Sequence, residues 1–369
     1  MSKAAELAAL IGSQSALSNR NLVINGAMQV AQRGTSFDAA EQYLCDRWRF
    51  GRQTDGYDLT WAQSTTTPDG FGNSLKMDVT TADTSLNANV FALLQQRFEG
   101  QNLQMLKKGT SAAESVTVSF FVRSAKTGTY IVELTDQDNS TRHINKSYTI
   151  NSADTWEYKS ITFEGDTTGA LDNDANRSLN VNWWLAAGTD FSSGTLATSW
   201  QTLDATDRAV GQVNIFDSTS NDWYITGVQM ELGEQATPFE HRSFADELYR
   251  CKRYFQKSFN YDTAPENGGS SDVSFNGGLL SYCGSNNNGA FSGFHRFDPE
   301  MRATPTITTF GNSSGHWGSL SPTNTGTTSF SSGAGFLTNT KASGVNFGQN
   351  VSGDTLLIGF GHLTADAEL

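Results

Sequence analysis

Hydrophobic and polar residues alternate along much of the chain between Asn21 and about Phe239. In SVTVSFFVRSA, for example, one face carries Val116, Val118, Phe120 and Val122. The same period recurs in SLKMDV, TYIVELTD, SLNVNWWLAAG and DWYITGVQMEL. A period of two predicts half-buried β-strands. Because the strands recur at irregular spacing, the pattern favours a two-sheet antiparallel sandwich, with a jelly roll as first choice, over a parallel repeat solenoid.

The last strand of this region changes phase. Apolar residues occupy odd positions up to Ile225 and even positions from Val228 onward, and Gly227 lies at the change. One extra residue in a strand resets which face points inward, and glycine tolerates the backbone angles of a bulge. We therefore predict a bulged or kinked strand at Gly227.

The segment SFADELYRCKRYFQK predicts a helix that connects the sandwich to another module. Ser243 is a candidate N-cap, acidic residues fill the first turn, and basic residues follow toward the end. This basic cluster is explained by helix-end chemistry with solvated flanks, or alternatively by an acidic neighbouring subunit. One narrow apolar seam, which suits self-association around an axis, is formed by Phe244, Leu248, Cys251 and Phe255.

The two ends of the chain differ from this central region. From about Ser258 to Leu369 the chain is rich in Gly, Ser, Asn and Thr, with short strand-like segments. We expect a second, smaller β-sandwich there, whose thin apolar content indicates stabilisation by neighbouring copies. Near the start, KAAELAALI places Leu7, Leu10 and Ile11 on one face of a helix too short to be stable alone. It is read as an attachment helix, with a frayed terminus as the alternative.

These patterns divide the chain into four parts. The predicted attachment helix takes residues 1–18 and the jelly-roll domain takes residues 19–241. The connecting helix takes residues 242–257, and a distal β domain takes residues 258–369. The expected fold class is all-β.

Composition and charge narrow the function. The 369 residues carry a net charge of −13, with 37% hydrophobic residues, 11% aromatic residues and 35 glycines. Nucleic acids and anionic membranes are bound through basic patches, so this charge argues against both partners and leaves neutral polar ligands such as sugars. The N-terminus lacks the uncharged core of a secretory signal, and no apolar stretch is long enough to span a membrane. We expect synthesis in the cytosol and no membrane insertion.

Residues with reactive side chains form no recognisable catalytic pattern. Cys45, Cys251 and Cys283 cannot all pair within one chain and match no zinc motif, so they are read as reduced, buried thiols. The five histidines are scattered, and no nucleophile-elbow, Walker or dinucleotide motif is present. We expect no catalytic residues, no enzyme activity and no cofactor.

Two stretches carry a resemblance. NLVINGAMQVAQRGTS with the following CDRW, and VQMELGEQATPFEHRSFADELYRCKRYFQ, together resemble a family of bacteriophage virion proteins that serve as tail fibres or host-recognition fibres. They bracket residues 21 to 256, while the distal region resembles the family only in MRATPTI. The resemblance implies a jelly-roll domain similar to carbohydrate-binding modules.

The resemblance also implies how such a protein is used. Its family is homotrimeric, is attached to other virion proteins through the N-terminus, and contacts host-surface glycans with its distal region. The same module occurs in proteins mounted on the capsid, so a decoration or head fibre with a structural role is an alternative to a tail fibre. A polysaccharide-degrading tail spike is the second alternative. In each case the protein is made in the host cytoplasm and localises to the virion.

Glycan binding needs a flat aromatic face flanked by hydrogen-bonding groups. Phe121 and Trp184 stand on the polar side of their strands, near Arg123 and Asn182. Packing under a loop or against a sister subunit is the alternative for both rings. His316 and Trp317 are further candidates, because they lie among Gly and Ser in a predicted loop. For these two residues, filling of a local core is the alternative.

The segment LDNDANRS concentrates oxygen donors of the kind that calcium prefers. Asp172 and Asp174 are the candidate ligands, but the spacing of an EF-hand loop is absent. A polar turn is the alternative to a structural calcium site.

Overall fold

The computed structural model describes a defined part of the backbone, and the chain in it folds into two compact units. The first unit holds the described residues up to Ala31, Thr35–Phe244 and Leu369, and the second holds Gln32–Gly34 and Ala245–Glu368. The described residues are 20–53, 56–266, 279–283, 290–310, 316–321, 324–327, 330–331, 334–336, 338–348 and 357–369. The segment with Leu7, Leu10 and Ile11 lies outside them.

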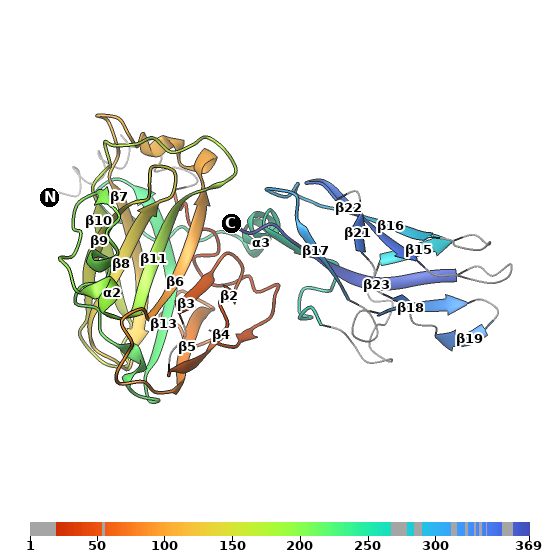
Figure 1. Cartoon of the computed structure of the whole chain (residues 1–369), viewed down its shortest axis with the longest axis horizontal. Coiled ribbons are helices and arrows are strands. Elements are labelled where there is room, and N and C mark those ends of the chain that lie inside the picture. The colour runs from red at the N-terminus through yellow and green to blue at the C-terminus, as the bar shows by residue number, and fades with distance from the viewer. Residues whose placement is uncertain are drawn as a thin grey trace. The chain divides into compact units, whose positions relative to one another are not determined.

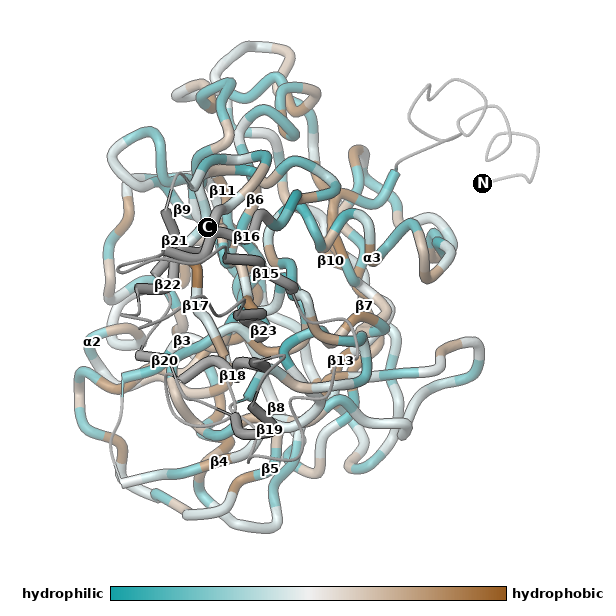
Figure 2. Tube along the Cα trace, turned by 90° about the vertical axis from the view of Figure 1, so that its right-hand side faces the viewer, coloured by the Kyte–Doolittle hydropathy of each residue, from teal (hydrophilic) through white to brown (hydrophobic). Residues whose placement is uncertain are grey.

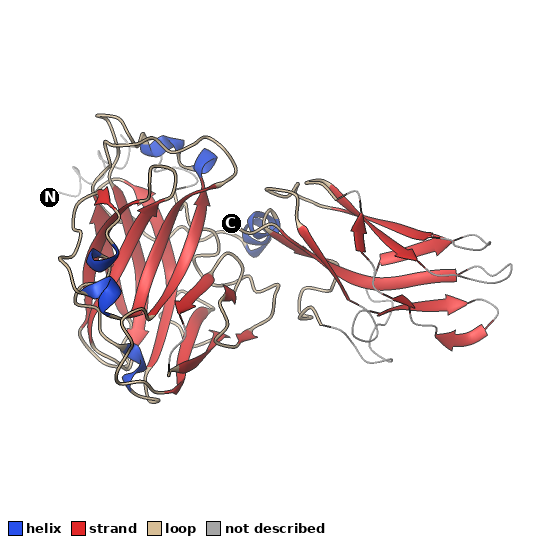
Figure 3. Cartoon of the chain, in the orientation of Figure 1, coloured by secondary structure: helices blue, strands red, loops and turns tan. Residues whose placement is uncertain are grey.

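The first unit is a sandwich of two antiparallel sheets (Figures 1 and 3). The six-stranded sheet has the order β1 (Ser36–Phe37), β4 (Asp58–Ser64), β5 (Ser74–Thr81), β13 (Asp222–Leu232), β7 (Val116–Ser124) and β10 (Glu157–Phe163). The seven-stranded sheet has the order β12 (Gln201–Thr202), β9 (Arg142–Ile150), β8 (Gly128–Asp136), β11 (Arg177–Ala187), β6 (Phe91–Glu99), β3 (Arg49–Gln53) and β2 (Gln42–Tyr43). The predicted all-β class and jelly-roll sandwich are confirmed.

Short helical turns lie in the loops between these strands. They are η2 (Gly100–Asn102), η3 (Gln104–Leu106), α2 (Thr189–Ser192), η4 (Ala205–Asp207) and η5 (Ile215–Asp217). Each is too short to form a packing layer of its own, so the sandwich is held by sheet-on-sheet contacts.

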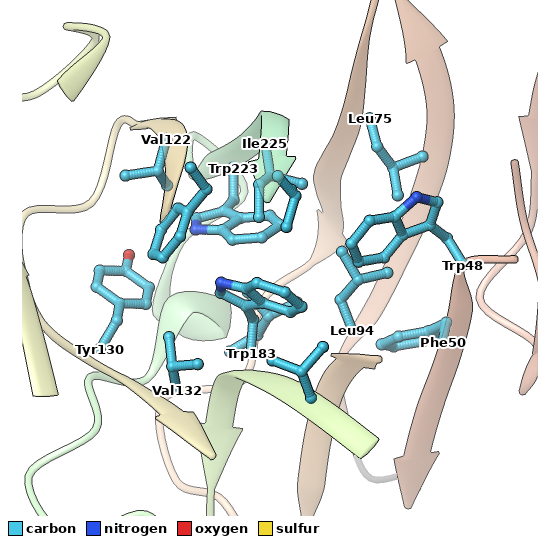
Figure 4. Close-up of a cluster of buried hydrophobic side chains, with 14 of the residues drawn as sticks. Trp48, Phe50, Leu75, Leu94, Val122, Tyr130, Val132, Trp183, Trp223 and Ile225 are labelled. Carbon is cyan, nitrogen blue, oxygen red and sulfur yellow. The ribbon is translucent and has the colours of Figure 1, made fainter. Parts of the chain in front are cut away.

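The core lies between the two sheets and is rich in tryptophan. Apolar and polar positions are interspersed along the strands (Figure 2), and the apolar set points inward. Trp183 lies at the centre, with its ring centroid 5.5 Å from Trp48 and 5.7 Å from Phe120 (Figure 4). Tilted and edge-on rings at these distances are favourable arrangements for aromatic pairs. Burial of such large rings therefore ties the two sheets together.

The phase change in β13 is a bulge, as predicted. The pairing of β13 with β7 shifts register between Thr226 and Gln229, and Gly227 has a φ of 61°. A Cβ at Gly227 would lie 2.6 Å from Cζ of Phe71. Glycine is therefore required here both for the backbone angle and for the close approach of a ring.

The first stretch of the resemblance, which begins at Asn21, lies against β13. The Asn21 side chain donates to the backbone oxygen of Val228 at 3.0 Å and accepts from the backbone nitrogen of Met230 at 3.1 Å. A Cβ at Gly26 would lie 2.1 Å from that same Val228 oxygen. These residues close the sandwich by joining the start of the unit to its last strand.

The second stretch forms a strap across the outer face of the six-stranded sheet. Glu231 accepts hydrogen bonds from the backbone nitrogen of Thr237 at 2.9 Å and from its hydroxyl at 2.7 Å. The Glu240 carboxylate accepts a hydrogen bond from the backbone nitrogen of Asn21 at 2.8 Å. The backbone nitrogen of Glu240 donates to the Gln229 side chain, also at 2.8 Å. The strap, residues 233–242, is therefore held against the outward-facing side chains at the end of β13.

The second unit is a smaller β domain of two antiparallel sheets. One sheet contains β14 (Phe255–Lys257), β15 (Leu279–Cys283), β17 (Thr306–Phe310), β18 (His316–Ser321), β19 (Asn324–Thr327), β20 (Phe330–Ser331) and β23 (Leu357–Asp366). The other contains β16 (Ala290–Arg296), β21 (Ala334–Phe336) and β22 (Ala342–Gly348). Strand β23 pairs with β14, β15, β17 and β18, so it is the central element of this unit.

The helix α3 (Phe244–Lys252) is shorter than predicted, and this corrects the seam. The chain turns after the helix, where the backbone nitrogen of Tyr254 donates to the backbone oxygen of Cys251 at 2.9 Å. Phe255 is therefore the first residue of β14 and not part of the helix. The Cys251 side chain is buried within the unit, whereas Phe244 is 42% exposed and Leu248 is half-buried. Only the first half of the predicted seam therefore faces outward, and the homotrimer stays a prediction.

The charges of α3 follow the helix dipole, as predicted. Asp246 and Glu247 lie in the first turn, and Arg250 and Lys252 lie in the last turn. Helix-end chemistry therefore accounts for these two basic residues of the cluster.

Cys45 and Cys251 are buried and form no disulfide within the described part of the chain. Burial, with the nearby charge of Asp46, raises the pKa of the Cys45 thiol well above its usual range. The side chain of Cys283 lies outside the described part of the structure. Among the described residues, no helix has the length and apolar character needed to cross a membrane.

Candidate functional site

An aromatic strip lies on the outer face of the six-stranded sheet and includes the end of the strap. Antiparallel pairing places Tyr158 of β10 directly opposite Phe121 of β7 on the outer face. The strip consists of Phe71, Phe121, Tyr158, Phe239 and His241. Four separate segments therefore contribute to one surface: two adjacent strands, the loop before β5, and the end of the strap.

The rings of the aromatic strip contact one another in sequence. The ring centroid of Phe121 lies 5.1 Å from Tyr158 and 5.4 Å from Phe71, and Phe71 lies 5.1 Å from Phe239. Tyr158 is 48% exposed, His241 is exposed, and the three phenylalanines are partly exposed. Packing fixes the inner rings, so Tyr158 is presented to solvent at low cost in side-chain entropy.

Charged groups lie beside the aromatic strip on the same face. The Arg123 guanidinium lies 4.8 Å from the centroid of the Tyr224 ring and 2.8 Å from the Asp154 carboxylate. Lys76 lies 5.6 Å from the same tyrosine centroid. Phe121 and Arg123, two of the residues chosen from the sequence, therefore share one surface that offers both a ring face and hydrogen-bonding groups.

Trp184 and Asn182, the other strand candidates, lie on the outer face of the opposite sheet. The Trp184 ring is fully buried beneath the segment that follows β11, with Phe191 at a centroid distance of 5.7 Å and the Arg208 guanidinium at 4.9 Å. Asn182 is 2% exposed and donates to Glu133 at 2.9 Å. This corrects their assignment as open glycan contacts: packing under a loop is what the structure shows.

A buried ion pair holds that covering segment down. Arg208 donates to both carboxylate oxygens of Glu133, at 2.7 and 2.8 Å. Burial by itself would raise the pKa of Glu133, but the charge and hydrogen bonds of Arg208 lower it to about 2. The indole of Trp184 donates to the same carboxylate at 3.2 Å. The Glu133 carboxylate therefore holds both the Trp184 ring and the segment that covers it.

Asp172 and Asp174 are not assembled into a metal site. Asp174 accepts from the backbone nitrogen of Asn176 at 2.8 Å and from its side chain at 2.5 Å, which is the geometry of a polar turn. Within the described ranges, no group of three or more His, Cys, Asp or Glu side chains is positioned to hold a metal ion. The turn reading of LDNDANRS is therefore the one that the structure supports.

His316 and Trp317 begin strand β18 and are not in a loop. Backbone pairing sets them opposite Ser331 and Phe330 of β20. A run of Gly and Ser was read as loop from composition, but main-chain pairing with a neighbouring strand overrides that weak local preference. Their side chains lie outside the described residues.

Four residues of the aromatic strip were missed from the sequence. Alternation in TWEYKSITF places Trp156, Tyr158 and Ser160 on one face, so Tyr158 could have been found by pairing this strand with the Phe121 strand. Phe71, Phe239 and His241 lie in loops without any period, and only the fold brings them together. The aromatic strip is therefore formed by tertiary structure, and of the four missed residues only Tyr158 could have been predicted from strand alternation.

Comparison with known proteins gives weak likenesses to solved structures. The tailspike protein 4 enzymatically active domain of bacteriophage CBA120 is 13% identical, with a TM-score of 0.30, over 58% of this chain and 21% of that chain. A putative sugar binding protein from Bacteroides thetaiotaomicron is 12% identical, with a TM-score of 0.33, over 58% of this chain and 100% of that chain. The family 11 carbohydrate-binding module from Clostridium thermocellum is 11% identical, with a TM-score of 0.28, over 56% and 99% of the two chains.

No family model and no curated protein matches the chain. The matched region spans about a fifth of the tailspike chain, at 21%.

Proposed function

We propose that the chain is a bacteriophage virion fibre protein that binds host-surface glycans without chemical change. The observation that carries the proposal is the partly exposed aromatic strip, with Tyr158 at 48% exposure, beside Arg123 and Lys76. Resemblance of residues 21 to 256 to phage fibre proteins supports the virion role.

The strip has the chemistry that a sugar chain requires. The apolar face of a pyranose ring stacks on an aromatic ring, and its hydroxyls need donors and acceptors at the edge. Tyr158 supplies an exposed ring, while Arg123, Lys76 and Asp154 lie on the same side of the sheet or at its edge. The chain carries a net charge of −13, which would repel an anionic ligand at long range. A neutral glycan meets no such repulsion.

Assembly would turn weak sites into tight binding. In the proposed homotrimer, three linked sites raise avidity through effective concentration, provided that they can engage together. Exposure of Phe244 at 42% and Tyr249 at 55% on α3 supplies apolar surface for contact between copies. We expect light scattering to give three times the mass of one chain, and a stable monomer would contradict the trimer.

Tyr158 gives the sharpest test of the binding site. Tyr158→Ala should weaken binding to the matching polysaccharide on an array of bacterial surface glycans by about 10-fold per site, because one stacking contact is lost. Tyr158→Phe keeps the ring and should bind within about twofold. Both variants should keep the thermal midpoint of the wild type, since this side chain is largely exposed.

Equal binding by Tyr158→Ala and the wild type would refute the strip as the glycan site. Release of reducing ends from the bound polysaccharide would instead indicate a degrading spike. Immunogold labelling of virions distinguishes a tail fibre from a head fibre, and absence of label on virions would refute the virion role.

A further inference from the structure

Arginines gather on the outer face of the seven-stranded sheet, opposite the aromatic strip. Strand pairing sets Arg49 beside Gln95, and Arg97 beside Asn180, while Arg177 begins β11 next to Glu99. We call Arg49, Arg97 and Arg177, with Tyr43 of β2, the arginine face. The covering segment that buries Trp184 lies over another part of the same sheet, packed on Leu93 and Ile131.

Two of these arginines have no Asp or Glu side chain as an ion-pair partner. Arg49 forms an ion pair with Glu41. Arg97 donates through Nε to Gln95 at 2.6 Å, and Arg177 donates through Nε to Asn180 at 2.7 Å, so both are held by neutral side chains. In the described part of the chain, no Asp or Glu lies within ion-pair distance of Arg97 or Arg177. Positive charge therefore accumulates locally on a chain whose net charge is −13.

The positive charges of these arginines repel one another, which makes the protonated form of each less favourable. Burial, and then the charge of Arg97, lowers the pKa of Arg177 to about 10. The same two causes lower the pKa of Arg49 to about 10. A bound anion would relieve this repulsion, as expected of a binding site and not of a structural ion-pair network.

Donors on this face already converge on an oxygen atom. The backbone oxygen of Leu369, which belongs to the same unit, accepts from Nη1 of Arg97 and from the Tyr43 hydroxyl at 2.8 Å. The face therefore presents convergent donors to an oxygen atom.

We propose that the arginine face binds a carboxylate-bearing sugar, such as a uronic acid residue. Arg97 and Arg177 hold the carboxylate, and the Tyr43 hydroxyl donates to it in place of the Leu369 oxygen. Guanidinium groups match carboxylates through paired N–H donors. A polyphosphate is disfavoured, because the rest of this acidic chain would repel it. The site is separate from the aromatic strip, so it goes beyond the proposed function.

Titration of the full chain with sodium glucuronate, followed by calorimetry and thermal unfolding, tests the proposal. At about ten times the dissociation constant, glucuronate should raise the thermal midpoint by about 3 °C. Arg97→Gln with Arg177→Gln should remove this rise and weaken binding by at least about 30-fold. Lys107→Gln, which removes one exposed positive charge outside both surfaces, is the matched control and should leave glucuronate binding unchanged.

The thermal midpoint of the variants without glucuronate provides a second readout. If the arginines had a purely structural role, their removal would lower this midpoint. Removing Arg97 relieves repulsion, so Arg97→Gln alone should keep or raise the thermal midpoint, and a clear fall would contradict the proposal. Absence of glucuronate binding, or equal binding of glucose and glucuronate, would overturn it. Tyr158→Ala separates the two sites: loss of array binding with glucuronate binding intact would leave both proposals standing.

Discussion

Replacing Glu133 with Gln should lower the free energy of unfolding by about 3–5 kcal/mol at neutral pH. The carboxylate is fully buried and receives Arg208 at 2.7 and 2.8 Å, so the neutral amide leaves a guanidinium without its counter-charge. Two further donors, from Asn182 and Trp184, would also lose a charged acceptor. Urea unfolding followed by circular dichroism measures the change.

The effect should depend on pH with a defined sign. The pKa of Glu133 is lowered from 4.5 to about 2 in the folded protein, so its stabilisation is complete above about pH 4.5. It is lost as the pH falls through about 2, where the folded carboxylate takes up its proton. The gap in stability between the wild type and Glu133→Gln should therefore be constant near pH 6 and should close between pH 4.5 and 2.

An exposed ion pair serves as the control. Lys107 and Glu114 are 53% and 39% exposed in their side chains, so Glu114→Gln should cost less than about 1 kcal/mol. Intrinsic fluorescence adds a local readout, because loosening the segment over Trp184 would bring water to a buried indole. A gap that stays constant down to pH 2 would show that the charge of Glu133 is not what stabilises the fold.

Strand alternation predicted which side of a sheet a residue faces, but not what lies above it. Phe121 and Trp184 were chosen by the same rule, and both point outward from their sheets. Phe121 stays partly exposed, whereas Trp184 is covered by the segment after β11. That covering depends on Arg208 reaching Glu133, which are 75 residues apart in sequence. A pattern with a period of two holds no information about such a contact.

Local signals predicted local geometry well. The phase change at Gly227 predicted the bulge, because a register shift must move every following side chain to the other face. The end of the helix was missed by several residues, since Phe255 continues the apolar spacing of α3 but pairs with Asp366 of β23. Pairing with a distant strand overrode the helical pattern there.

Five of the residues that carry the family resemblance have structural contacts. Asn21 and Gly26 contact β13, while Glu231, Thr237 and Glu240 hold the strap. None of these five belongs to the aromatic strip or the arginine face. Phe239 and His241 of the same stretch do belong to the aromatic strip, so the resemblance covers the closure of the sandwich and part of the proposed binding surface.

Gly26→Ala should cost about 3 kcal/mol of folding free energy, because it acts at this closure. A Cβ there would lie 2.1 Å from the Val228 oxygen and 3.3 Å from Nδ2 of Asn21, so backbone must move. The movement would also disturb the hydrogen bond from the Val228 nitrogen to the Gly26 oxygen, at 2.9 Å. Denaturant unfolding of the full chain measures the loss.

Gly72→Ala is the matched control, since a Cβ at Gly72 would meet no atom within 4 Å. It should change the free energy of unfolding by no more than about 0.5 kcal/mol. An equal effect of the two substitutions would mean that glycine flexibility, and not the contact with β13, sets the cost. A loss of stability confined to Gly26→Ala would show that residue 26 must lack a side chain for the first residues of the sandwich to contact its last strand.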